Sequence, residues 1–159
     1  MHIMKKDRVI EMIHDFFKEI NWQYDYDEGK NIFHSGISMG NVIGNLRIVI
    51  YVRERYYKVY ATLSSKSDKE HIANIAEYLH RANYDLNNGN FELDYNDGEI
   101  RYKMLVPFQG IELGKRIVDE SIIVPIMMFD RYGKGLIKLM VGSGSPKELI
   151  EEAEAPSDE

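Results

Sequence analysis

The sequence predicts an α+β fold, with an antiparallel β-sheet and helices packed mainly on one of its faces. Two observations support this fold class. Segments in which hydrophobic and polar residues alternate follow one another across short turns, as in β-hairpins. Segments in which hydrophobic residues recur every three or four positions stand before, between and after these strands. Strands joined by short turns pair antiparallel, so the expected element order is α-β-β-β-β-α-β-β-α(-α).

The chain is expected to start with a helix and a hairpin. A helix is predicted over residues 7–20 because its hydrophobic side chains share one face: Val9, Ile10, Ile13, Phe16, Phe17 and Ile20. Asn21 can end this helix in a left-handed conformation. Alternation then predicts a strand over 22–26 and a weaker one over 33–39, joined by a turn at 27–30.

The strongest strand signals follow, over residues 46–52 and 57–63. Residues 67–70 match a capping box, which predicts that a helix begins there. Its hydrophobic face includes one amide, that of Asn83: Ile72, Ile75, Ala76, Leu79, Ala82, Asn83 and Leu86. A buried amide needs hydrogen-bond partners, and the turn at 87–89 offers free backbone groups. A structural role for Asn83 is therefore expected, with ligand binding as the alternative.

A second hairpin and a long helix are predicted next. Residues 91–95 and 100–106 alternate as strands around a turn at 96–98. A helix is expected over about 112–131, with a kink at Pro125 because proline lacks the N–H of the helical ladder.

The last segments are harder to assign. Residues 136–141 follow two glycines and fit either a helix or a strand. Residues 145–148 form a second capping box, so a short helix should run to about Ala153. We therefore expect one domain over 1–153 and an acidic disordered tail over 154–159.

Composition narrows the class of protein. The 159 residues contain no cysteine, which excludes disulfides, thiolate metal sites and cysteine nucleophiles. The longest hydrophobic run, 122–129, is far shorter than the roughly 20 residues that span a membrane, and no signal peptide is recognised. A soluble cytoplasmic protein without membrane contact is expected. The net charge of −6 also argues against general nucleic-acid binding.

One face of the predicted sheet is both basic and aromatic. If Leu46, Ile48 and Ile50 face the helices, the alternate side chains face away from them. Together with neighbouring strands they form the candidate partner-binding set: Arg47, Tyr51, Arg53, Lys58, Tyr60, Arg101 and Lys103. The alternative is ordinary cross-strand pairing with the acids Glu92 and Asp94.

No motif supports a catalytic or metal site. Glu77 and His80 have the Glu-x-x-His spacing of carboxylate metal sites, but such sites need the motif twice and two further carboxylates. The five histidines lack a recognisable nucleophile context. We therefore expect no catalytic residue, no bound metal and no cofactor. Residues 142–145 form a glycine-rich turn before a helix, which leaves a small-ligand or phosphate-binding regulator as the alternative.

Several stretches of the chain resemble the YbjN family of small bacterial proteins. The matching stretches are residues 59–63, 80–84, 89–94, 97–103, 128–132 and 145–150, in the family's order. The resemblance extends over about 22–152. It implies the fold of type III secretion chaperones, commonly a homodimer, and the family is described as sensory transduction regulators without an established reaction.

These observations together predict a non-enzymatic cytoplasmic protein, chaperone-like or regulatory, that binds a protein partner. A homodimer is also expected, because the predicted long helix is hydrophobic on more than one face. The side chains left over for a dimer interface are Ile123, Met127 and Met128, and the alternative is that residues 136–141 cover them within one chain.

Overall fold

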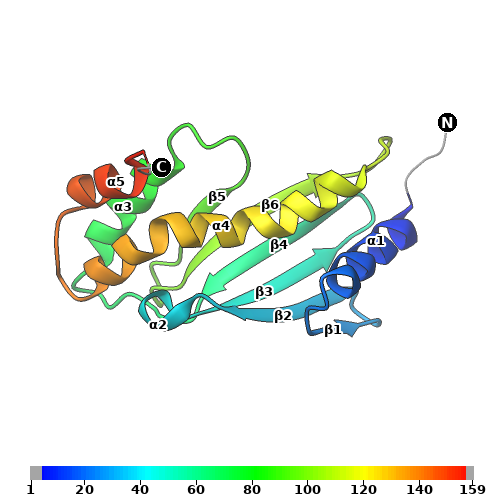
Figure 1. Cartoon of the computed structure of the whole chain (residues 1–159), viewed down its shortest axis with the longest axis horizontal. Helices are drawn as coiled ribbons and strands as arrows, with labels where there is room; N and C mark the ends of the chain where they lie inside the picture. The colour runs from blue at the N-terminus through cyan, green and yellow to red at the C-terminus, as the bar shows by residue number, and fades with distance from the viewer. Residues whose placement is uncertain (1–4, 157–159) are drawn as a thin grey trace.

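A six-stranded antiparallel sheet and five helices make up residues 5–156, the part of the chain that the computed structural model describes (Figure 1). The elements in chain order are α1 (Lys6–Glu19), β1 (Tyr24–Asp27), β2 (Ile32–Ser38), α2 (Gly40–Ile43), β3 (Asn45–Val52), β4 (Tyr56–Leu63), α3 (Ile72–Asn83), β5 (Asn90–Leu93), β6 (Ile100–Pro107), α4 (Lys115–Met140) and α5 (Pro146–Glu154). The strand order is β1-β2-β3-β4-β6-β5. The predicted α+β fold class is confirmed, with α2 as an additional single turn.

The helices cover one face of the sheet (Figure 1). Alternate residues of the central strands are buried against them, because side chains in a strand point to opposite faces in turn. These are Leu46, Ile48, Ile50 and Val52 of β3, Tyr57, Val59, Ala61 and Leu63 of β4, and Ile100, Tyr102, Met104 and Val106 of β6. The assignment of Leu46, Ile48 and Ile50 to the helix side is therefore correct.

The end of α1 is as predicted. Asn21 adopts a left-handed conformation with φ of 52°, two residues after the helix ends at Glu19. The Trp22 amide then donates to the Phe17 carbonyl at 2.9 Å. The chain thereby reverses into β1, so that α1 packs on the neighbouring strands.

The capping box predicted at 67–70 is not formed. The Ser67 hydroxyl donates to the Asp68 carbonyl, and the Asp68 carboxylate accepts the His71 amide at 3.0 Å. Helix α3 therefore starts only at Ile72, because Asp68 closes a turn ahead of it.

The long helix α4 continues through Pro125 and past residue 131, where the predicted helix ended. It runs without a break from Lys115 to Met140. The segment 136–141, which fitted either a helix or a strand, is therefore helical over 136–140. An added Cβ at Gly133 would lie 3.0 Å from Ile43, and one at Gly135 would lie 2.7 Å from the Tyr78 ring. Both glycines therefore mark close packing of α4 against α2 and α3.

The second capping box is half formed. The Ser145 hydroxyl accepts the Glu148 amide at 3.3 Å, and Pro146 occupies the first turn. Helix α5 extends to Glu154, whose carboxylate accepts a hydrogen bond from the Tyr132 hydroxyl at 3.0 Å. The first residue assigned to the acidic tail is thus part of α5, and residues 157–159 of that tail lie outside the described residues.

His14 of α1 sits against the aromatic side chains of the first hairpin. Its Nδ1 lies 2.7 Å from the Tyr24 hydroxyl. Three ring centroids surround the imidazole at 4.7–5.6 Å, those of Tyr24, Tyr26 and Phe33. Burial, followed by the positive charge of Lys18, lowers the pKa of His14 below its ordinary 6.5, while Asp15 acts in the opposite direction.

Acidification should therefore destabilise the fold through His14. The unfolded chain takes up this proton near pH 6.5, whereas the folded chain does so only at lower pH, so the free energy of unfolding should fall as pH decreases through that interval. Urea unfolding at about pH 7.5 and about pH 5.5 measures the loss. A His14→Gln variant should lose less stability between these two conditions. Equal losses in both proteins would contradict the role of His14.

Candidate functional site: the open sheet face

Six of the seven predicted partner-binding residues lie on the sheet face that the helices leave uncovered, called the open face below. Strand register aligns Arg47 with Thr62 and Tyr51 with Lys58 across β3 and β4. It aligns Tyr60 with Lys103, and Thr62 with Arg101, across β4 and β6. The six residues are Arg47, Tyr51, Lys58, Tyr60, Arg101 and Lys103, and all are exposed or half-buried.

Arg53, the seventh residue, lies just past the end of β3. Its guanidinium donates to the carbonyls of Lys30 and Val52, at 3.3 and 3.0 Å. It also lies 5.4 Å from the centre of the Tyr51 ring. Arg53 therefore extends the open face at the β3–β4 turn. Its guanidinium also contacts Tyr51, one of the two tyrosines described next.

Two tyrosines form the centre of the open face. The rings of Tyr51 and Tyr60 meet edge to face with centroids 5.7 Å apart. The Arg101 guanidinium stacks on the other side, 4.1 Å from the Tyr60 centroid. Such contacts hold the side chains in place before any partner arrives, which lowers the entropy cost of binding.

The positive charge of this face is partly neutralised. Glu92 of β5 binds both Arg101 and Lys103, at 2.8 and 3.3 Å. Glu99 lies 3.7 Å from Arg47. The cross-strand pairing considered as an alternative thus exists at Glu92. Among residues 5–156, Lys58 and Arg53 have no carboxylate within ion-pair distance, and they carry the uncompensated charge.

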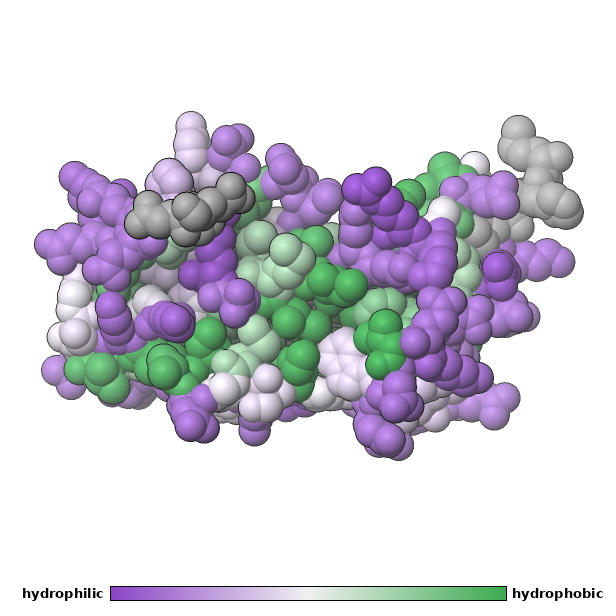
Figure 2. Space-filling model, in the orientation of Figure 1, coloured by the Kyte–Doolittle hydropathy of each residue, from purple (hydrophilic) through white to green (hydrophobic). Residues whose placement is uncertain are grey.

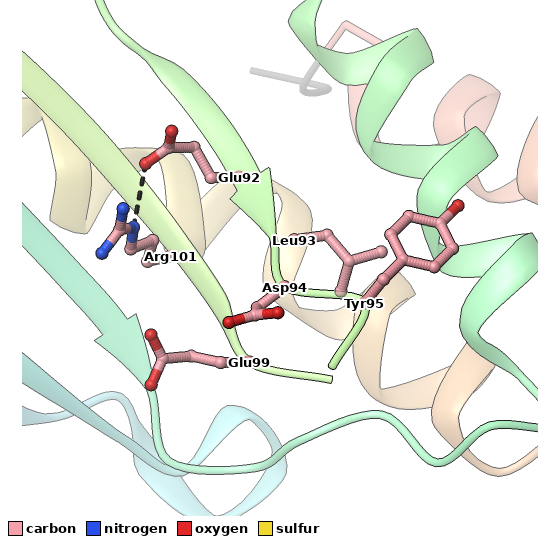
Figure 3. A pocket seen from close by; sticks show the side chains of 6 residues that line it. All are labelled: Glu92, Leu93, Asp94, Tyr95, Glu99 and Arg101. Atoms are coloured by element: carbon pink, nitrogen blue, oxygen red, sulfur yellow. Dashed lines mark hydrogen bonds and ion pairs between the residues drawn. The ribbon is translucent and has the colours of Figure 1, made fainter. Parts of the chain in front are cut away.

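Acidic side chains border the basic strip at both sheet edges. On β1, Asp25 aligns with His34 of β2 and Asp27 aligns with Ile32. By this register the two aspartates point to the same side of the sheet as the open face. At the other edge, a pocket of about 290 Å³ opens at the end of β5 and β6, lined by Glu92, Leu93, Asp94, Tyr95, Glu99 and Arg101. Figure 3 shows Glu92 bound to Arg101 across the two strands, while Leu93 and Tyr95 point away. A narrow cationic strip between carboxylates does not suit a long polyanion.

The residues assigned to a dimer interface lie on α4. The side chains of Ile123 and Met127 are exposed, whereas Met128 is half-buried against the core. Hydrophobic surface gathers over the middle of this helix in Figure 2. The structure thus leaves two of the three side chains free for contact, and the homodimer stays a prediction.

The glycine-rich turn at 142–145 serves the end of α4. The Ser143 amide donates to the Lys138 carbonyl at 2.9 Å, and the Gly142 amide donates to the Leu139 carbonyl at 3.1 Å. With Gly142 at φ of 74°, these two bonds form a Schellman motif. Three amides that a phosphate cradle could use, those of Gly142, Ser143 and Glu148, are thus already engaged, which does not favour the small-ligand alternative.

The candidate metal residues do not form a ligand set. Glu77 lies 3.5 Å from Arg81, and His80 is exposed. A group that sequence reasoning missed is Asp68, Glu70 and His71, whose donor atoms lie within 4.8 Å of one another. Hydrogen bonds from His71 lower the pKa of the Asp68 carboxyl. The turn before α3 therefore accounts for the short distances between these side chains.

Asn83 has the structural role that was expected, with a different partner. Its side-chain amide donates to the Phe91 carbonyl at 3.0 Å, and its carbonyl oxygen accepts the Phe91 amide at 2.7 Å. The partner is therefore the backbone of β5 rather than the turn at 87–89. The missing signal was the strand register, which leaves these two backbone groups of Phe91 without a strand partner.

Comparison with protein-family models and with curated proteins gives no match. The YbjN resemblance therefore stays a prediction. In the described part of the chain, no helix has both the length and the hydrophobicity to span a membrane.

Proposed function

We propose that this chain is a non-enzymatic protein-binding module, chaperone-like or regulatory, that holds an acidic, partly hydrophobic segment of a partner protein on its open face. The observation that carries the proposal is the strand register, which gathers two tyrosines and four basic side chains on one uncovered sheet face. Tyrosine and arginine are the residue types most enriched at binding hot spots.

Local charge supports an acidic partner. Lys58 and Arg53 lack carboxylate partners in the described structure, and they flank Tyr51 at one end of the strip. A segment that brings carboxylates to these two cations and a hydrophobic side chain to Tyr51 satisfies both features. The YbjN resemblance supports the chaperone-like or regulatory role. As part of the same proposal, the protein acts in the cytoplasm, as its composition predicts.

Removing one aromatic ring and reversing one charge should abolish partner binding. The test uses Tyr51→Ala combined with Arg53→Glu, and a synthetic peptide in which Asp and Glu alternate with Leu. Because each hot-spot residue contributes about 2 kcal/mol or more, affinity for the peptide should fall by at least about 30-fold. Isothermal calorimetry measures the affinity, and the thermal midpoint of unfolding verifies that the variant folds.

A matched control separates the open face from general charge effects. Lys134→Glu makes a charge reversal of the same size on an exposed position of α4. It should leave peptide affinity within about twofold of the original protein, because screening weakens distant charges. Unchanged binding by the double variant, or equal losses in both variants, would refute the proposed site.

A further inference from the structure

The sheet has an unpaired stretch of edge on its β6 side. Strand β5 pairs only with residues 100–103 of β6, from Leu93 opposite Ile100 to Asn90 opposite Lys103. Strand β6 itself continues to Pro107. Within the described residues, its last four positions therefore have a strand neighbour on one side only.

The register shows which backbone groups face that open edge. The Phe108 amide donates to the Arg55 carbonyl at 3.0 Å, so even-numbered positions of β6 direct their N–H and C=O toward β4. Odd-numbered positions face outward, and those at 101 and 103 face Glu92 and Asn90 of β5. The N–H and C=O of Leu105 and the C=O of Pro107 remain directed at the open edge.

The neighbouring strand shows how this fold closes an edge where it needs to. On β5 the N–H and C=O of Phe91 and Leu93 face outward, and Asn83 binds both groups of Phe91 with its side-chain amide. No described side chain does the same for Leu105, which is 52% exposed. Unpaired edges are usually protected, so an edge left open beside a protected one is a candidate for strand addition.

A hydrophobic groove runs beside this edge. It has a volume of about 320 Å³ and lies between the end of β6, the following loop, α4 and Asn88, which precedes β5. Its hydrophobic lining comes from Met104, Val106, Ile111, Leu113, Ile117 and Val124. Glu120 is the one charged side chain among the lining residues that the structure describes. Alternate side chains of a strand added at Leu105 would enter this groove.

The charge on the open-face side of β6 indicates which side chain an added strand would place there. Leu105 lies on the open face, where its register partner is Lys58 and its same-face neighbour is Lys103. Glu92 already binds Lys103, whereas Lys58 has no carboxylate partner in the described structure. An acidic residue opposite Leu105 would approach this free cation.

We propose that β6 receives an extended segment of a partner protein as an added strand at Leu105. The segment has an acidic side chain opposite Leu105, on the open-face side, and the hydrophobic side chain that precedes it enters the groove opposite Val106. Gly89 and Asn90 already occupy the positions beside Met104 and Lys103, so the added strand ends opposite Leu105. Its antiparallel pairing would use the N–H and C=O of Leu105 together. This site goes beyond the proposed function: it shares Lys58 with the open-face site but uses neither Tyr51 nor Arg53.

Amide hydrogen exchange on the full chain tests the proposal, with acetyl-Ser-Ile-Glu-amide as the probe, whose Glu would lie opposite Leu105 and whose Ile would lie opposite Val106. In the free protein the Leu105 amide should exchange faster than the amides of Met104 and Val106, which point toward β4. Peptide at about nine times its dissociation constant should slow Leu105 exchange by about tenfold. The same peptide with an N-methyl group on its Glu should give no protection, because it cannot donate to the Leu105 carbonyl.

Two protein variants complete the test. Leu105→Pro removes the outward N–H without touching the ladder to β4, and isothermal calorimetry should detect no binding of the peptide to this variant. Leu105→Ala keeps the N–H and should bind within about threefold of the original protein. The double variant Tyr51→Ala with Arg53→Glu should retain peptide binding, which distinguishes this site from the open face. Peptide binding without protection of Leu105, or a Leu105 amide already protected by self-association in light scattering, would overturn the proposal.

Discussion

Replacing Gly135 by alanine should destabilise the protein by about 2–4 kcal/mol, although the same change usually stabilises a helix by about 1 kcal/mol. Gly135 lies within α4, and an added Cβ would overlap the Tyr78 hydroxyl and lie 2.7 Å from its ring. Tyr78 cannot easily move, since it is fully buried and its hydroxyl donates to the Tyr132 carbonyl at 2.7 Å. The variant must therefore strain the packing of α3 on α4 or break a buried hydrogen bond.

Urea unfolding of three variants separates this cause from a general effect of glycine. Gly133→Ala meets only the side chain of Ile43, at 3.0 Å, and should cost less than Gly135→Ala. Combining Gly135→Ala with Tyr78→Phe removes the overlapping hydroxyl, so the double variant should be about 1–2 kcal/mol more stable than the sum of the two single effects. Additive effects, or a Gly135→Ala variant as stable as the original protein, would show that close packing against Tyr78 is not the reason for a glycine at position 135.

This pair of glycines also explains where sequence reasoning ended the long helix too early. Glycine lowers helix propensity, so Gly133 and Gly135 read as a break after residue 131. The reason for both residues is instead tertiary, because Ile43 and Tyr78 come from distant parts of the chain. Local propensity alone could not reveal a requirement set by another helix.

The strands were predictable because one face of the sheet is buried and the other is not. The alternation around Ile48 and Val59 fixed both the strand positions and the side chains of the open face. The predicted start of α3 at the capping box 67–70 was wrong, because Asp68 as well as Ser67 can cap a turn. Only tertiary structure shows that the carboxylate of Asp68 takes the His71 amide.

The sheet edge lay beyond sequence analysis. The alternation in β6 predicts its strand, but not that β5 begins opposite Lys103 and leaves Leu105 unpaired. That fact depends on the register of two strands and on the turn at Gly89, which has φ of 71°. The same register explains Asn83, whose amide is placed on a hydrophobic helix face because it binds the Phe91 backbone.

Replacing Asn83 by leucine should destabilise the protein by about 2–4 kcal/mol. Leucine has a similar shape, so the main change is the loss of both hydrogen bonds to Phe91. The Phe91 amide would then have no acceptor while the residue is only 3% exposed, and an unpaired buried group costs about 1–3 kcal/mol. Urea unfolding measures the total loss.

Asn90→Ala is the matched control for this variant. The Asn90 side chain also donates to the Phe91 carbonyl, at 3.2 Å, but it does not accept the Phe91 amide. Its removal should cost less than about 1 kcal/mol, since Asn83 still satisfies both backbone groups. Exchange of the Phe91 amide should accelerate in Asn83→Leu and not in Asn90→Ala. If both variants were equally stable, or if Phe91 exchange stayed slow in Asn83→Leu, Asn83 would not be the group that closes the β5 edge.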